Sequence, residues 1–134
     1  MDIRLAVLAD GANVSREGKL NVLGVFDTLY ARQFPCVHPH MALVLRFEAA
    51  PEEAGSTRQV EVQLVAADGR VLVSIPGAVT LQRHQLGERM VVDHVLAFTS
   101  TRFEAPGRYT FRVAVDGAVA AALPLRVEQL PTTH

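Results

Sequence analysis

The chain has 134 residues, a formal net charge of −1, 49% hydrophobic residues and 20% charged residues. This length fits one domain with a self-sufficient core, and the composition excludes a disordered chain. The balanced charge offers no electrostatic basis for binding nucleic acid or anionic lipid, so we expect neither nucleic acid nor membrane as a partner.

The cysteine content and the N-terminal stretch indicate a cellular compartment. Cys36 is the single cysteine, which excludes an internal disulfide and fits a reducing cytosol. The apolar run of residues 5–9 is closed by Asp10 and is too short for a signal-peptide core or a membrane span. We therefore expect a cytoplasmic protein.

The first third of the chain predicts two strands and a loop. Alternating apolar residues indicate a strand at 3–9. A longer strand is predicted at 19–31, and because both of its faces carry apolar side chains we expect it to be buried on both sides. The next segment, RQFPCVHPH (32–40), contains two prolines and is predicted to be a loop.

The rest of the chain reads as strands joined by short turns. Asp68-Gly69 and Asp116-Gly117 each lie between alternating runs, which predicts hairpins with type I′ turns, in which both central residues take positive φ. A loop is predicted at 82–88. The predicted strands are 41–48, 59–64, 71–75, 89–99, 109–115 and 119–127.

About eight strands with regular turns predict an all-β, antiparallel, immunoglobulin-like β-sandwich with little or no helix. The stretch Gly107-x-Tyr109-x-Phe111 is typical of a tyrosine corner, in which the tyrosine hydroxyl ties a turn to the incoming strand. A closed barrel is the alternative. We expect a single domain over 1–134, with its core at about 3–128 and a short tail at 129–134. Gly107, Tyr109 and Gly117 are its predicted structural residues.

Four segments carry a family resemblance: LADGANV, GKLNVLGVFDTLYARQFP, ADGR and FEAPGRYTFRVAVDG. In this order they resemble a family of small bacterial proteins classed only as a domain of unknown function, and the likeness covers about residues 3 to 128. The resemblance implies a compact β-sandwich. It supplies no activity, cofactor or catalytic residue.

Cys36, His38 and His40 are the candidate metal ligands, because alternate residues of an extended segment point the same way and thiolate with imidazole suits zinc. Pro39 stiffens this segment and no second cluster supplies a fourth ligand, so we favour no metal and expect no cofactor. His94 lies on an apolar face, where a core histidine is commoner than a catalytic one. Its neighbour Asp93 points to the opposite face.

The segment GAVAAALPLRV suggests a surface for protein contacts rather than a catalytic or metal-binding site. Val119, Leu123, Leu125 and Val127 are expected on one face, and Ala118, Ala120 and Ala122 form a small apolar second face that is the candidate interface. No convergent catalytic set is evident, so we expect no enzyme. The sequence favours a non-enzymatic protein-interaction or assembly module, with a protein partner or itself as a homodimer. A small-ligand or metal-binding protein using the 33–40 loop is the alternative.

Overall fold

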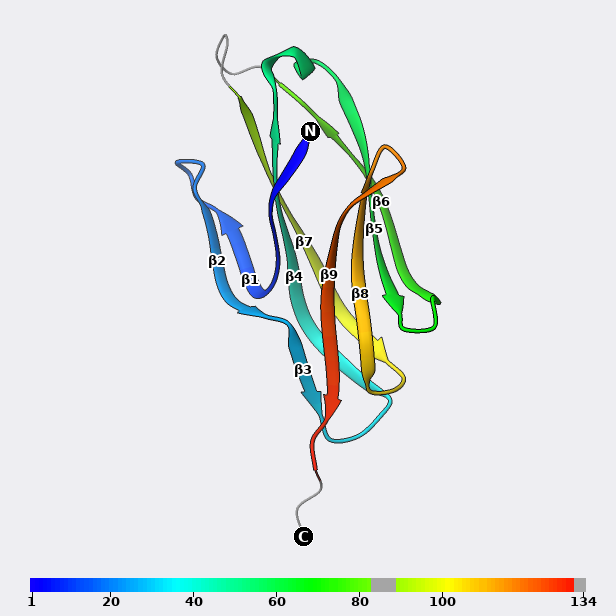
Figure 1. Cartoon of the computed structure of the whole chain (residues 1–134). Helices are drawn as coiled ribbons and strands as arrows, with labels where there is room; N and C mark the ends of the chain where they lie inside the picture. The colour runs from blue at the N-terminus through cyan, green and yellow to red at the C-terminus, as the bar shows by residue number, and fades with distance from the viewer. Residues whose placement is uncertain (83–88, 132–134) are drawn as a thin grey trace.

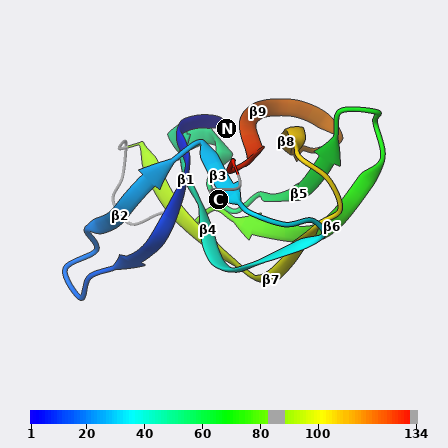
Figure 2. The same ribbon diagram turned by 90° about the horizontal axis from the view of Figure 1, so that it is seen from below.

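The computed structural model describes residues 1–82 and 89–131, and in these residues the chain forms two packed β-sheets (Figures 1 and 2). Sheet 1 has the order β2 (Leu20–Phe26), β1 (Asp2–Val14), β4 (Cys36–Ala49) and β7 (Met90–Phe103). Sheet 2 has the order β3 (Thr28–Ala31), β9 (Ala118–Gln129), β8 (Gly107–Val115), β5 (Thr57–Ala66) and β6 (Val71–Thr80). The predicted all-β sandwich is confirmed.

Helical structure in the described residues is limited to one 3₁₀ turn at Pro51–Glu53, between β4 and β5. No helix in the described part of the chain is long and apolar enough to cross a membrane. Most of the predicted loop at 82–88 and the end of the predicted tail lie outside the described residues.

The core between the two sheets is made by the inward faces that the alternation predicts. Met41, Leu43, Leu45 and Phe47 of β4 are fully buried, as are Leu64, Phe111 and Leu125 of sheet 2. Phe98 of β7 meets Phe111 edge-on, with ring centroids 5.1 Å apart. Such aromatic pairs stabilise a core beyond the area they bury.

The prediction of one continuous strand over 19–31 is wrong. The chain leaves sheet 1 after Phe26 and enters sheet 2 at Thr28, so β2 and β3 belong to different sheets. β3 pairs in parallel with residues 126–129 of β9. The expected burial on both faces is also wrong, because β2 is an edge strand and leaves Leu23 and Val25 76% and 63% exposed.

The predicted loop at 32–40 is wrong for its second half, because β4 begins at Cys36 and pairs residues 36–40 with β7. Pro39 is tolerated here because β1 pairs with β4 only over Ala42–Glu48 and so leaves one side of residues 36–40 without a strand. The long pairing of β4 with β7 thus outweighs the local preference of the two prolines for a loop.

Both predicted hairpins are present, with different turns. Asp116 and Gly117 have φ of 50° and 84°, as a type I′ turn requires. At the other hairpin only Gly69 has positive φ, and the Gly69 amide donates to the Ala66 carbonyl at 2.9 Å. The prediction of a type I′ turn at Asp68-Gly69 is therefore wrong, although the hairpin itself is confirmed.

Candidate functional site

The outer face of sheet 1, away from the core, is apolar across three strands. Val7 of β1 pairs with Val44 of β4, which pairs with Val95 of β7. The next row continues across the sheet as Ala9, Ala42 and Ala97. We call these six residues together with Leu5 the apolar face.

The centre of the apolar face is buried. Ala9 and Val44 are 0% exposed and Ala42 is 2% exposed, yet all three point away from the core that lies between the sheets. Their neighbours Leu5, Val7 and Val95 are half-buried and surround them. The chain itself therefore already shields the centre of this face from solvent.

A two-stranded arm, residues 10–26, turns back along the sandwich (Figure 1), so that Val14 and Gly18 at its tip line a pocket together with Met90, Val91, Val92 and Asp93 at the start of β7. Within it β1 pairs with β2 alone, since the pairing of β1 with β4 ends at Ala9. Val25 pairs with Ala9, which places Val25 and Leu23 on the side of the apolar face. A two-stranded ribbon with exposed leucine and valine is marginal by itself in water.

One residue of the arm must be glycine. Gly24 has φ of 74°, and a Cβ there would collide with the carboxylate of Asp10 on the neighbouring strand. Only glycine combines this backbone conformation with so close an approach. The close packing of Asp10 against Gly24 keeps the two strands of the arm in register.

The charged side chains beside the apolar face lie at one of its ends and balance one another. Arg46 holds Asp93 with two hydrogen bonds of 2.7 and 3.0 Å, and both Arg4 and Arg89 contact Glu48, at 2.5 and 3.1 Å. The hydrogen bond from Arg46 to Asp93 raises the pKa of the Arg46 guanidinium. With Asp2, which pairs with Glu48 across the strands, this end carries three acids and three bases.

Sequence reasoning missed the apolar face, although a signal was present. The stretches LAVLA (5–9) and MALVL (41–45) are apolar at every position, which is typical of strands covered on both sides. In the structure the outer residues Ala9, Ala42 and Val44 are buried as well as the inner ones.

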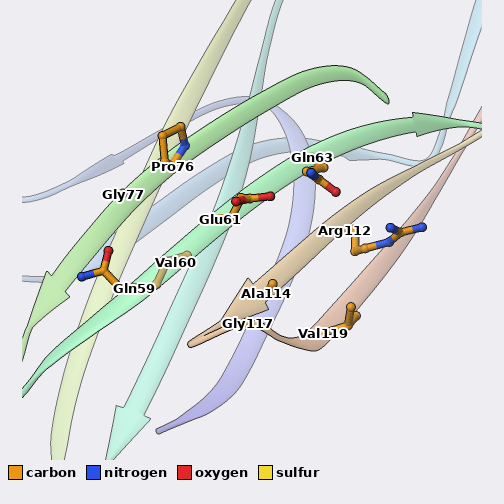
Figure 3. A pocket seen from close by; sticks show the side chains of 10 residues that line it. All are labelled: Gln59, Val60, Glu61, Gln63, Pro76, Gly77, Arg112, Ala114, Gly117 and Val119. Carbon is orange, nitrogen blue, oxygen red and sulfur yellow. The ribbon is translucent and has the colours of Figure 1, made fainter. Parts of the chain in front are cut away.

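The outer face of sheet 2 holds a groove of about 330 Å³ (Figure 3). Its polar side chains are Gln59, Glu61 and Gln63 of β5 and Arg112 of β8, over small residues such as Gly77 and Ala114. These groups can hydrogen-bond a polar ligand. None of the ten lining residues carries the thiol, imidazole or hydroxyl of a nucleophile.

Cys36 and His38 lie near each other beside a small cavity of about 60 Å³, and His40 lies further along β4 and is exposed. The His38 ring packs against Phe26 at 6.1 Å, and its buried Nε2 has no hydrogen-bond partner in the described structure. Burial raises the pKa of the Cys36 thiol, which disfavours the thiolate that a metal needs. Within residues 1–82 and 89–131, no group of three His, Cys, Asp or Glu residues could hold a metal ion.

His94 lies on the inward face of β7, as predicted, and its ring meets Phe47 edge-on at 6.5 Å. Asp93 points to the outer face and pairs with Arg46. The structure therefore does not bring His94 and Asp93 together.

The alanine segment of β9 differs from the predicted pattern. A bulge at Ala120 lets Ala121 pair with Val113 and Val119 pair with Ala114. The prediction that Val119 faces the core is wrong, since it is 60% exposed and lines the groove of sheet 2. Ala118, Ala120 and Ala122 are exposed. β9 is an edge only in part, because β3 pairs with its last four residues.

The predicted tyrosine corner is present. The Tyr109 hydroxyl donates to the Ala105 carbonyl at 2.5 Å, and the buried ring meets Phe103 edge-on at 4.9 Å. Burial raises the pKa of this hydroxyl. Gly107 begins β8, and Gly117 completes the turn between β8 and β9. The hydrogen bond and the buried ring of Tyr109 tie the turn before β8 to the core.

A second polar cluster links the two sheets at the end of the sandwich opposite the tyrosine corner. The Glu53 carboxylate accepts hydrogen bonds from the Met1 amino group at 2.8 Å, Arg58 at 2.7 Å and the Ala50 amide at 2.9 Å. These bonds, that from the Met1 amino group first, lower the pKa of Glu53 to about 2. Arg58 also reaches Asp116 at 3.0 Å.

Comparison with known proteins identifies a family without assigning an activity. No curated protein matches the chain. Among solved structures, the DNA-bound alkylpurine DNA glycosylase AlkC of Pseudomonas fluorescens matches 95% of this chain and 30% of its own, with a TM-score of 0.45 and 14% identity. A glycosyl hydrolase family 2 member from Bacteroides cellulosilyticus matches 76% of this chain and 15% of its own, with a TM-score of 0.37 and 14% identity.

The family model spans nearly the whole chain, as the four resembling segments predict. It covers residues 4–128, from β1 into β9. This chain therefore belongs to the family of unknown function DUF6941.

Proposed function

We propose that the chain is a non-enzymatic protein-interaction or assembly module that docks through the exposed apolar side chains of the arm. The observation that carries this proposal is the exposure of Leu23 and Val25 on one side of the arm, at 76% and 63%. Large apolar side chains that are exposed next to one another are typical of interaction sites.

The contrast with a solvent-facing sheet supports docking. A solvated outer face alternates polar with apolar residues, as β5 does with Gln59, Glu61 and Gln63. The arm instead exposes Leu23 and Val25, so a protein partner that covers them would remove apolar surface from water. Each Å² covered contributes roughly 25 cal/mol.

The strand order supports the finer expectation of an immunoglobulin-like topology. β1, β4 and β7 are neighbours in one sheet and β9, β8 and β5 in the other, which matches the A-B-E and G-F-C arrangement of such domains. Domains of this architecture often act by presenting surfaces on a rigid sandwich. The single free thiol, Cys36, agrees with the proposed cytoplasmic location.

Side-chain footprinting in an extract of the cells that make the protein tests the proposal. Hydroxyl radicals label exposed leucine and valine, so we expect Leu23 and Val25 to be labelled in dilute purified protein and protected in the extract. Val119 is the matched control, because it is 60% exposed on the other sheet. Equal labelling of Leu23 and Val25 with and without extract would remove the basis for this function.

A further inference from the structure

We infer that the groove on the outer face of sheet 2 binds a small zwitterion, namely a free α-amino acid with an apolar side chain. The groove lies on sheet 2 and the arm extends from sheet 1, so this inference goes beyond the proposed function and does not depend on it. The volume of the groove, about 330 Å³, is in the range of small-molecule sites. Its lining comes from four neighbouring strands and from the turn that joins β8 to β9 (Figure 3).

Two opposite charges border the groove at neighbouring positions. Glu61 of β5 pairs with Ala114 of β8, and Arg112 precedes Ala114 by two residues on the same strand. Glu61 and Arg112 are therefore diagonal neighbours on one face of the sheet, where Cα atoms lie about 7–8 Å apart. Both side chains are long enough to reach one molecule placed between them.

Both charges are available to a ligand. All the ion pairs found within residues 1–82 and 89–131 join other groups, and both Glu61 and Arg112 are exposed. Gln63 is directly opposite Arg112, and its amide can both donate and accept hydrogen bonds. A carboxylate, a guanidinium and an amide thus border the same space (Figure 3).

This combination of groups favours a ligand that carries both charges. The Arg112 guanidinium matches a carboxylate, and the Glu61 carboxylate matches an ammonium group. An anion is repelled by Glu61 and a cation is repelled by Arg112, whereas a zwitterion is attracted by both. The ten lining residues include no aromatic side chain on which a nucleobase could stack.

Small residues leave space for the side chain of the ligand. Ala114 lies between the two charges, because it is opposite Glu61 and adjacent to Arg112 on the same face. Gly77 and Gly117 add no side chains to the lining. The bound amino acid therefore places its ammonium group at Glu61, its carboxylate at Arg112 and its apolar side chain over Ala114.

Titration of the isotope-labelled chain with L-leucine, followed by NMR, tests the inference. We expect the amide signals around the groove to shift and saturate with a dissociation constant of about 0.1–1 mM, because water screens charges at exposed positions. N-acetyl-leucine lacks the ammonium group and leucinamide lacks the carboxylate, so each should bind at least about fivefold more weakly. The absence of a saturable shift at tens of millimolar L-leucine, or equal binding of the three compounds, overturns the inference.

Single substitutions assign each charge to a group of the ligand. Arg112→Gln should weaken the binding of L-leucine at least about fivefold and leave that of leucinamide nearly unchanged, since leucinamide has no carboxylate to lose. Glu61→Gln should weaken L-leucine likewise and spare N-acetyl-leucine. Arg108→Gln is the matched control, because Arg108 is exposed on the same face of β8 and does not line the groove. Equal losses for L-leucine and leucinamide in Arg112→Gln overturn the inference.

An uncharged substitution gives a test that is independent of the charges. Ala114→Met fills the space that the leucine side chain needs, so L-leucine should bind at least about fivefold more weakly, whereas the binding of glycine, which has no side chain, should be unchanged. Amide signals away from the groove report whether each variant is folded. Binding of L-leucine that persists at full strength in Ala114→Met overturns the inference.

Discussion

The outer faces of the two sheets differ in their pattern of polar and apolar side chains. On sheet 2, β5 alternates buried valine and leucine with exposed glutamine and glutamate, and water covers the outer side. On sheet 1, the middle strands β1 and β4 are apolar on both sides, and Val44 is fully buried without belonging to the core between the sheets. The comparison teaches that sheet 1 is buried on both sides at its centre, whereas sheet 2 is buried mainly on its inner side.

The largest expected effect compares one substitution on the two outer faces. Val44→Asp should lower the free energy of unfolding by about 3–5 kcal/mol, because it buries a carboxylate without a partner. Val119→Asp, on the outer face of sheet 2, should change it by less than about 1 kcal/mol. Urea unfolding measures both. Equal losses would mean that the two outer faces do not differ.

The tyrosine corner tests whether both sheets unfold together. Tyr109→Ala should cost about 3 kcal/mol, because it leaves a cavity beside Phe103. Tyr109→Phe removes only the hydrogen bond to Ala105 and should cost about 1 kcal/mol. Thermal unfolding followed by circular dichroism gives both values. No loss in either variant would show that the turn holds without the tyrosine.

The Glu53 cluster joins the start of sheet 1 to β5 of sheet 2, and its effect depends on pH. The folded pKa of Glu53 is about 2, below its ordinary value of 4.5. Its stabilisation is therefore present above about pH 4.5 and is lost as the pH falls toward 2, in total about 3 kcal/mol.

Glu53→Gln should therefore destabilise the protein at neutral pH and lessen the loss of stability between pH 4.5 and 2. Urea unfolding at several pH values measures this change. Glu52→Gln is the control, since the neighbouring Glu52 is exposed. Parallel pH profiles for wild type and Glu53→Gln would contradict the role of the carboxylate.

The smallest expected effect concerns zinc at Cys36, His38 and His40. We expect micromolar zinc to leave the melting temperature unchanged, because a raised thiol pKa disfavours the ligand form of Cys36. A ligand that binds only the folded chain must raise the melting temperature. A rise of several degrees that Cys36→Ser abolishes would restore the metal-binding alternative.

Local patterns in the sequence were sufficient for the fold class and for several sites. The alternation of Met41, Leu43, Leu45 and Phe47, the two Asp-Gly hairpins and the Tyr109 corner each depend on residues close together in the chain. Side-chain period and turn chemistry are local properties, and the structure confirms these predictions.

Other features were decided only by partners distant in the chain. Pairing with β7 draws Cys36–His40 into a strand, the crossing at Asp27 splits a continuous apolar run between two sheets, and the bulge at Ala120 turns Val119 outward. The apolar runs at 5–9 and 41–45 indicate strands that are buried on both faces. Only the packing of the sheets decides which of the two faces lies against the core. Burial is a property of the whole fold, because it depends on which strands meet, and this is why the apolar face became evident only in three dimensions.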